Sequence, residues 1–319
     1  MEEYDITAGW GINTLCNFKC PYCLIKIHNM NDTIIGEKDL DKIINSFDET
    51  KKTWLIWMTG GEPFLHPRFI ELCKRLTKKH YIAMNTNLSS PLVYNFCKEI
   101  DPKRVLRLNC SLHITERERL GLKEDFVEKV KLLKERGFRV WVSQVMWPPV
   151  LEKFDKIYEE FRKRDIFIVP YSFSGEYNGK KYPEAYTKKE RKKMQYYFNE
   201  TKINNGITKQ NISPKIKLKR KLIENDLMGQ LSFKGKQCLA GKNNIVINYE
   251  GDIFRCYDDN TKLGNIFKGN VKLLDKPEIC KSEKCSCYPT GLGSCLGEPR
   301  VICPSFGTRL KQKIRVLFR

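Results

Sequence analysis

Residues 6–23 read Ile6-Thr-Ala-Gly-Trp-Gly-Ile-Asn-Thr-Leu-Cys16-Asn-Phe-Lys-Cys20-Pro-Tyr-Cys23, a β-rich run followed at once by three closely spaced cysteines. From there to about residue 174, short β-rich runs alternate with helical patterns, which is typical of βαβ units and a parallel sheet. Strands are predicted at residues 6–15, 53–59, 81–86, 104–112, 138–146 and 166–172, with helices at 37–47, 68–79, 92–100, 126–136 and 151–164. The predicted fold class is therefore α/β, with a partial (β/α)6 TIM-like barrel and a small cysteine-rich α+β domain after it.

The fourth predicted strand alternates in character along its length. From residue 106 to residue 113 the even-numbered positions are Leu or Cys, and the odd-numbered positions are Arg107, Asn109, Ser111 and His113. Polar residues near the carboxyl end of a barrel strand indicate a binding site, because a lining built only for packing would be aliphatic. The alternative is that this polar face meets solvent at a sheet edge.

The sequence also indicates the cellular location of the protein. The first residues are acidic and no apolar run reaches the roughly 18 residues of a membrane span, so we expect a cytoplasmic protein without a signal peptide or a membrane span. The chain has 13 cysteines, and in a reducing compartment these favour metal binding or catalysis over disulfides.

The cysteine triplet follows the first predicted strand directly. Thiolates are the usual ligands of iron-sulfur clusters, and a [4Fe-4S] cluster normally takes four of them. Three ligands from Cys16, Cys20 and Cys23 would leave one iron open to a substrate or cosubstrate. Structural zinc is the alternative, although zinc prefers four paired ligands.

The spacing Cys-x3-Cys-x2-Cys, with Tyr22 before the last cysteine, resembles the signature of the radical S-adenosylmethionine (SAM) superfamily. A second match is Thr59-Gly60-Gly61-Glu62-Pro63 at the end of the second predicted strand. The resemblance implies that the triplet holds a [4Fe-4S] cluster and that Gly60, Gly61 and Glu62 bind the methionine amino group of SAM. It also implies reductive cleavage of SAM to a 5′-deoxyadenosyl radical, which removes a hydrogen atom from a substrate.

The same resemblance suggests further cosubstrate contacts by position in the barrel. Ser111 would contact the ribose, Asn87 would share that pocket, and Tyr22 would pack against the adenine. Gln144 on the fifth predicted strand is a weaker candidate.

Seven more cysteines follow residue 237. Cys238-x12-Gly251-x4-Cys256, with a predicted hairpin before Cys256, resembles the start of the SPASM or twitch domains that carry auxiliary clusters. The resemblance implies one auxiliary [4Fe-4S] cluster held by Cys238, Cys256 and two of Cys280, Cys285 and Cys287, of which the last two compete. The spacing departs from the full SPASM order, so a second cluster using Cys295 and Cys303, or a zinc site, remains an alternative.

The other three cysteines, Cys73, Cys97 and Cys110, lie in apolar patterns and are predicted to be small core residues. Three ranges are expected: the barrel at 1–176, a basic connector at 177–236 and the auxiliary cluster domain at 237–319. The connector has 16 Lys or Arg against 5 Asp or Glu, which suggests a solvated linker or a lid over an anionic substrate.

The substrate is the least determined feature. The first strand begins within ten residues of the amino terminus, which we take as leaving no room for a leader-peptide-binding domain and as favouring oxidation or epimerisation of a small or carbohydrate-type molecule. Maturation of a ribosomally made peptide or protein is the alternative. The net charge of +20 suggests an acidic electron donor such as flavodoxin or ferredoxin. It would also allow an RNA-binding or RNA-modifying protein, but no stacking motif for nucleic acid is present.

Overall fold

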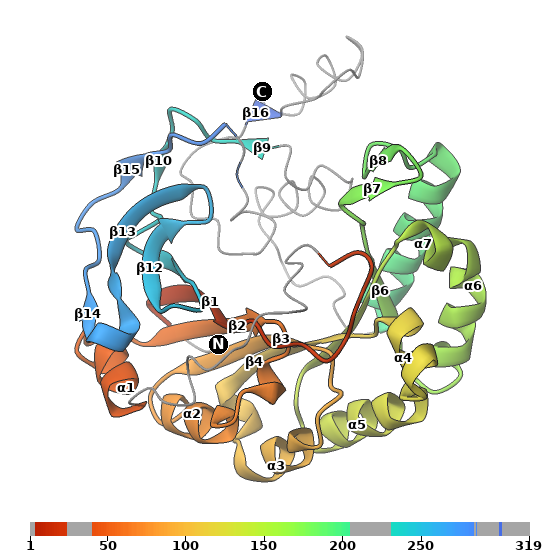
Figure 1. Ribbon diagram of the computed structural model, residues 1–319, viewed down its shortest axis with the longest axis horizontal. Coiled ribbons are helices and arrows are strands. Elements are labelled where there is room, and N and C mark those ends of the chain that lie inside the picture. The colour runs from red at the N-terminus through yellow and green to blue at the C-terminus, as the bar shows by residue number, and fades with distance from the viewer. Residues whose placement is uncertain (1–3, 24–39, 205–230, 284, 286–299, 302–319) are drawn as a thin grey trace.

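The computed structural model describes residues 4–23, 40–204, 231–283, 285 and 300–301. Its main sheet runs in the order β14-β13-β12-β11-β1-β2-β3-β4-β5-β6, and the strands β1 to β6 are parallel (Figure 1). Their bounds are β1 Ile6–Asn13, β2 Trp54–Gly60, β3 Tyr81–Thr86, β4 Val105–Ser111, β5 Val140–Val145 and β6 Ile168–Tyr171. The predicted α/β class and partial barrel are confirmed.

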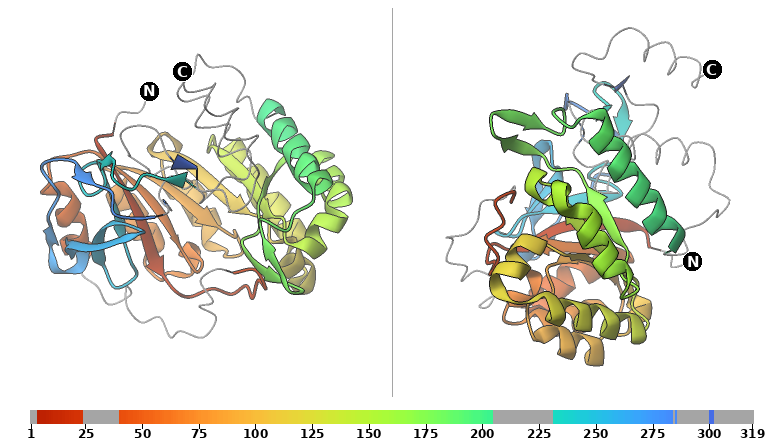
Figure 2. Two further views of the ribbon diagram at one scale, coloured as in Figure 1. Left: turned by 90° about the horizontal axis from the view of Figure 1, so that it is seen from above. Right: turned by 90° about the vertical axis from the view of Figure 1, so that its right-hand side faces the viewer.

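Helices follow the strands and cover the convex face of the sheet (Figures 1 and 2). They are α1 Leu40–Asp48, α2 Phe69–Leu76, α3 Leu92–Glu99, α4 Ile114–Leu120, α5 Lys123–Glu135 and α6 Pro148–Arg162. The described ranges also contain three short 3-10 turns, η1 Pro63–Leu65, η2 Pro102–Arg104 and η3 Ile266–Lys268. The helix α4 was not predicted, because its seven residues are mostly polar or charged and too few for a helical period to emerge.

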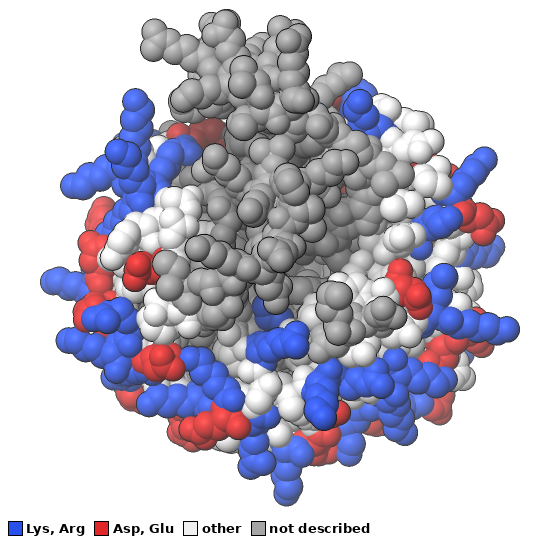
Figure 3. All heavy atoms as spheres, turned by 180° about the vertical axis from the view of Figure 1, so that it is seen from behind, with Lys and Arg blue, Asp and Glu red and all other residues white. Residues whose placement is uncertain are grey.

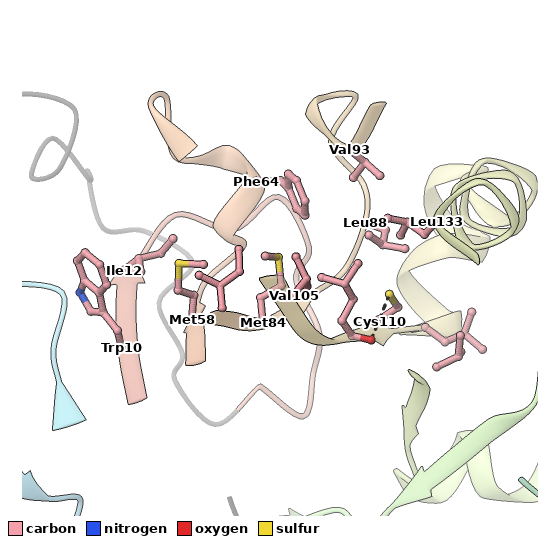
Figure 4. Close-up of a cluster of buried hydrophobic side chains, with 14 of the residues drawn as sticks. Trp10, Ile12, Met58, Phe64, Met84, Leu88, Val93, Val105, Cys110 and Leu133 are labelled. Atoms are coloured by element: carbon pink, nitrogen blue, oxygen red, sulfur yellow. Dashed lines mark hydrogen bonds between the residues drawn. The ribbon is translucent and has the colours of Figure 1, made fainter. Parts of the chain in front are cut away.

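The core lies between the outer face of the strands and the helices. Figure 4 shows Met58 on β2, Met84 on β3 and Cys110 on β4 in one row, with Phe64 and Leu133 packed over them. All five side chains are 0–1% exposed. Leu108 and Cys110 of β4 are thus buried, which leaves Arg107, Asn109 and Ser111 on the concave face, as the alternation predicts. Leu106 departs from the prediction and is only half-buried, since the register of β3 and β4 shifts at this point and Val105 lies in the core instead.

The C-terminal part of the chain extends the same sheet. β11 Asn244–Ile247 pairs parallel with β1, and β12 Asp252–Cys256 returns antiparallel to it, so the predicted hairpin is confirmed. β13 Asp259–Asn265 and β14 Asn270–Val271 complete this edge. The Ser46 hydroxyl of α1 donates to the Ile266 carbonyl at 3.1 Å, which ties the barrel helix to this region.

Smaller elements complete the described chain. β7 Gly175–Tyr177 and β8 Lys180–Tyr182 form a hairpin, and α7 Lys188–Asn204 packs on β6 through the Thr201 hydroxyl, which donates to the Ile168 carbonyl at 2.9 Å. β10 Gln237–Cys238 pairs with β15 Glu278–Ile279, and β9 Leu231–Ser232 pairs with β16 Arg300–Val301.

The outer surface carries charges of both signs. Figure 3 shows lysines and arginines spread over the described surface with acidic side chains among them. Several pair within one helical turn, such as Arg162 with Glu159 at 2.7 Å, and such exposed pairs contribute little stability. Among the described residues, no helix combines the length and the apolar character needed to cross a bilayer.

Candidate active site

A cavity of about 300 Å³ lies at the carboxyl ends of the barrel strands. This edge is where barrel enzymes place their sites, since the loops after all the parallel strands meet there. The lining includes the cysteine triplet and five of the seven predicted cosubstrate contacts: Cys16, Cys20, Cys23, Tyr22, Gly60, Gly61, Asn87 and Ser111. Residues far apart in the sequence are therefore brought together as the motifs predict, whereas Glu62 and the weaker candidate Gln144 are missing from the lining.

The cysteine loop is held from both sides. Its backbone turns tightly, with the Cys23 amide donating to the Cys20 carbonyl at 3.1 Å. The Lys19 amide donates to the carboxylate of Glu116, on α4, at 2.8 Å. Glu116 is 4% exposed and also accepts from Arg119, so its orientation is fixed. The short helix that sequence reasoning missed thus anchors the loop between the first two cysteines.

Gly60, the last residue of β2, and Gly61, which follows it, allow a close approach to the end of β1. A Cβ on Gly60, whose φ is +151°, would lie 2.4 Å from the Asn13 carbonyl oxygen, and one on Gly61 would lie 2.1 Å from the Leu15 carbonyl oxygen. The Gly61 amide donates to the Asn13 carbonyl at 3.0 Å. A side chain at either position would push the two strand ends apart. The close contact that requires glycine here is with the chain itself.

Glu62 lies behind the cavity wall and is fully buried. Its carboxylate accepts from the Thr86 hydroxyl at 2.6 Å, the Asn87 amide at 2.6 Å and the Phe64 amide at 3.1 Å. Burial raises the pKa of Glu62, and these hydrogen bonds together with the nearby Arg117 charge oppose the rise. The carboxylate therefore connects the ends of β2 and β3, and its contact with SAM stays a prediction.

Arg117 completes this internal network. It is fully buried, and its guanidinium donates to the carbonyls of Leu112, at 2.7 Å, and of Asn87. Its charge lies 4.0 Å from the centre of the Phe126 ring and 5.3 Å from that of Phe18, which lines the cavity. The cavity wall formed after β3 and β4 is thus braced from behind by one cation.

His113 and Tyr22 face each other at the cavity. The Tyr22 hydroxyl lies 3.0 Å from Nδ1 of His113, which adopts a left-handed backbone conformation with φ +45°. Burial, reinforced by the charge of Arg117, lowers the pKa of His113 to about 4, so the imidazole is neutral near pH 7. Gln144 lies behind them, where its Oε1 accepts from the Ile114 amide at 3.0 Å.

The chemistry of the triplet fits a metal cluster. Burial raises the pKa of Cys16 to about 11 and of Cys20 to about 12, and nearby acidic groups add to both shifts. Such thiols become thiolates only beside a strong positive charge, which bound iron supplies. Within the described residues, no three His, Cys, Asp or Glu side chains converge closely enough to hold a single metal ion, whereas a [4Fe-4S] cluster takes one thiolate per iron.

The C-terminal cysteines gather in a second group. The pKa of Cys280 is raised by burial and by the charges of Cys238, Cys285 and Cys256. Cys238 and Cys285 are buried, and Cys256 and Cys280 are half-buried. The predicted ligands Cys287, Cys295 and Cys303 lie outside the described residues. Elsewhere, Cys73, Cys97 and Cys110 lie in α2, α3 and β4 at 0–8% exposure, which confirms them as core residues.

Some lining residues were not predicted from the sequence. They are Phe18, Thr86, Val145 and the run Ser172, Phe173 and Ser174 after β6. The position of that run at the end of a barrel strand was the available signal, since it begins at the last residue of the sixth predicted strand.

The family is decided by the match of residues 12–163 to the model of the Radical SAM superfamily. The barrel belongs to the radical SAM superfamily. Its motifs and its fold agree with that assignment.

Similar proteins extend the comparison beyond the barrel. GTP 3′,8-cyclase of Clostridium perfringens is 27% identical over 154 residues, which are 44% of this chain and 45% of the cyclase, so the match spans less than half of that relative. The Bacillus subtilis antilisterial bacteriocin subtilosin biosynthesis protein AlbA is 22% identical over 337 residues, covering 93% of this chain and 70% of AlbA.

Among solved structures, anSMEcpe with bound AdoMet is similar with a TM-score of 0.57 and 20% identity, covering 82% of this chain and 78% of that one. Another structure of anSMEcpe holds AdoMet and the Cp18Cys peptide. At this identity the likeness concerns the fold alone. It nevertheless reaches well past residues 12–163 and so includes part of the C-terminal region.

Proposed function

We propose that this chain is a radical SAM enzyme, with a [4Fe-4S] cluster and SAM as its cofactors, and that it modifies a peptide. The observation that carries the proposal is the alignment with AlbA, a bacteriocin biosynthesis protein, because it covers 93% of this chain rather than the barrel alone. The fold shared with anSMEcpe, which has been solved with a bound peptide, supports the same choice. We therefore prefer the peptide alternative to the small or carbohydrate-type substrate that the sequence first favoured.

Each part of the cavity has a role in this proposal. Cys16, Cys20 and Cys23 would hold the [4Fe-4S] cluster, and the backbone of Gly60 and Gly61 would face the methionine end of SAM. When bound, these cofactors supply an electron and a carbon-centred radical that removes a hydrogen atom from the substrate. The chain's own contribution is to bind, to orient and to exclude water.

The remaining lining residues would position SAM and the substrate. Ser111 and Asn87 offer polar groups at the ends of β4 and β3, which suits a ribose. Tyr22 is buried among aromatic rings, with its ring centre 5.8 Å from that of His113 and 6.0 Å from that of Trp147, and presents a flat apolar face that suits adenine. The neutral His113 would hold the Tyr22 hydroxyl in place.

We further propose that Cys238, Cys256, Cys280 and Cys285 hold one auxiliary [4Fe-4S] cluster. The mutual influence of these four thiols on the pKa of Cys280 supports this set. Four thiolates complete a closed cluster, so Cys287 would not be needed. Such a cluster could accept the second electron of an oxidation.

Anaerobic reconstitution with iron, sulfide, SAM and dithionite tests the enzymatic part of the proposal. We expect 5′-deoxyadenosine, and in the presence of the correct peptide a loss of hydrogen from that peptide, measured by mass spectrometry. Formation of 5′-deoxyadenosine stimulated only by sugars or other small molecules would contradict the peptide substrate.

Iron content tests the auxiliary cluster. The double variant Cys238→Ala, Cys256→Ala should lower bound iron by about four atoms per chain, because only two of the four thiolates of the auxiliary cluster would remain. Cys97→Ala is the matched control, since Cys97 is also largely buried but lies in α3, within the barrel, and should leave the iron content unchanged. Equal iron in both variants would contradict the assignment.

A further inference from the structure

The concave face of the sheet carries an arginine that no described acidic group neutralises. Arg107 projects from the middle of β4, on the same face as Asn109 and Ser111. It forms no ion pair with a described residue, and its Nε is buried without a hydrogen-bond partner there. Burial lowers its pKa, and among the described residues only the nearby Tyr171 side chain opposes the shift.

Two tryptophans hold this side chain between them. The guanidinium carbon lies 4.8 Å from the centre of the Trp57 ring, on β2, and 5.6 Å from that of Trp141, on β5. The register explains the geometry, because Trp57 pairs with Ala83 and Ala83 pairs with Arg107. The small Ala83 lets the arginine lean across β3 and reach the indole two strands away. An arginine stacked in this way is held in place with its N–H edge free for a ligand.

The groups around the guanidinium add donors but no negative charge. The indole N–H of Trp141 is buried without a hydrogen-bond partner among the described residues, and its influence on the pKa of Tyr171 shows that the Tyr171 hydroxyl lies near it. Asn109 is engaged separately, because its side-chain amide donates to the Asn85 oxygen at 3.0 Å. A cationic fork beside a hydroxyl donor, between aromatic walls, matches the two oxygens of a carboxylate.

Arg107 lies on the strands that also line the cavity, but nearer to their amino ends. Thr59 lines the cavity two residues beyond Trp57 on β2, and Ser111 lines it four residues beyond Arg107 on β4. At about 3.3 Å per residue, the backbone of Arg107 lies roughly 13 Å from that of Ser111 along the strand. The side chains bridge part of this distance, so the separation suits one or two residues of an extended peptide. Asn85, which lines the cavity and accepts a hydrogen bond from Asn109, lies between Arg107 and the SAM end of the cavity along the strand direction.

We propose that Arg107, sandwiched by Trp57 and Trp141 and facing Tyr171, anchors a carboxylate of the substrate while the reacting carbon lies in the SAM cavity. The inference rests on the proposed function, because it takes the substrate to be a peptide that carries an Asp or Glu side chain or a free C-terminal carboxylate. A half-buried cation that is desolvated without a partner destabilises a fold, so such an arginine is explained when a ligand neutralises it.

Affinity selection with defined peptide pools tests this anchor. The reconstituted full chain with SAM is immobilised and exposed to acetylated hexapeptide amides that carry either one Glu or one Gln, and to a pool with Gln and a free C-terminal carboxylate. Bound peptides are quantified by mass spectrometry. The chain should enrich at least one carboxylate pool about tenfold or more over the Gln amide pool. Enrichment of the Glu amides identifies a side-chain carboxylate, and enrichment of the free acids identifies the C-terminus.

Three variants separate the anchor from general charge and from folding. Arg107→Gln and Arg107→Met should both reduce the enrichment to about one. Arg104→Gln is the matched control, because Arg104 precedes the same strand and also lies over an aromatic ring, with its guanidinium carbon 5.0 Å from the centre of Tyr81. It should keep the enrichment. The unfolding midpoint of Arg107→Met should be no lower than that of the unsubstituted chain, because the methionine removes an unpaired, half-buried charge.

The outcomes distinguish this inference from the proposed function. Peptide binding without any preference for a carboxylate, or a preference that survives in both Arg107 variants, would overturn the anchor while the peptide substrate stands. Binding of glutarate that depends on Arg107, together with no binding of any peptide pool, would support the anchor and contradict the peptide substrate.

Discussion

The carboxylate of Glu62 offers the sharpest test of how the cavity wall is built. In Glu62→Gln one carboxylate oxygen becomes an NH2 group, which meets either the Asn87 amide or the Phe64 amide, and both of these are donors. The variant thus loses at least one hydrogen bond to a charged acceptor and leaves a buried donor unpaired. Each effect costs about 1–3 kcal/mol, and the easier burial of a neutral side chain offsets part of the sum. We expect a net loss of about 2–3 kcal/mol in the free energy of unfolding.

Thermal unfolding of the cofactor-free chain, followed by circular dichroism, measures this loss. With about 2.1 cal/mol/K of unfolding entropy per residue, a chain of 319 residues should melt roughly 3–5 °C lower. Glu71→Gln is the matched control, because Glu71 forms an exposed pair with Arg68 on the neighbouring α2, and it should change the free energy of unfolding by less than about 0.5 kcal/mol. Equal melting of the two variants would refute the argument. Unchanged melting with weakened SAM binding would show instead that the Glu62 carboxylate acts on the ligand.

Two further predictions concern the cysteine loop and the response to acid. Glu116→Ala leaves the Lys19 amide without its acceptor, so we expect less iron to be retained after reconstitution, whereas Glu118→Ala on the exposed side of the same helix should retain it; equal iron contents would exclude the anchoring role. The folded-state pKa of His113, about 4, lies below its unfolded value of 6.5, so the stability it contributes is complete above pH 6.5 and is lost as pH falls towards 4. Asparagine tolerates the left-handed backbone at this position. Between these pH values, the free energy of unfolding in urea should therefore fall by up to about 3 kcal/mol less for His113→Asn than for the unsubstituted chain. Parallel pH profiles of the two proteins would contradict this.

Most of the barrel could be predicted because its signals are local. The parallel strands alternate with amphipathic helices, and the polar face of β4 from Arg107 to Ser111 is visible as an alternation of residue types. The helix α4 could not be seen, because its seven residues carry four charges and its stability comes from tertiary contacts such as the burial of Arg117. The pairing of β11 with β1 joins residues more than 230 positions apart, and no local pattern specifies such a pairing.

The candidate site divides in the same way. The residues that carry the chemistry lie in two short motifs, the triplet Cys16, Cys20 and Cys23 and the segment Gly60-Gly61-Glu62. Both motifs can be recognised in the sequence from the types of their residues and the spacing between them. What each residue contacts is set by the fold. Glu62, which appears in its motif as a ligand contact, is turned into the protein by the donors of Thr86 and Asn87.

The sequence by itself determined the barrel, the cysteine triplet that begins it and the family to which it belongs. Only the tertiary structure decided that α4 anchors the cysteine loop, that the C-terminal hairpin extends the barrel sheet, and that Arg107 lies between two tryptophans with no acidic partner in the described part of the chain. The physical reason is that local periodicity and covalent spacing are readable along the chain, whereas burial, pairing and unpaired charge arise only when distant segments meet.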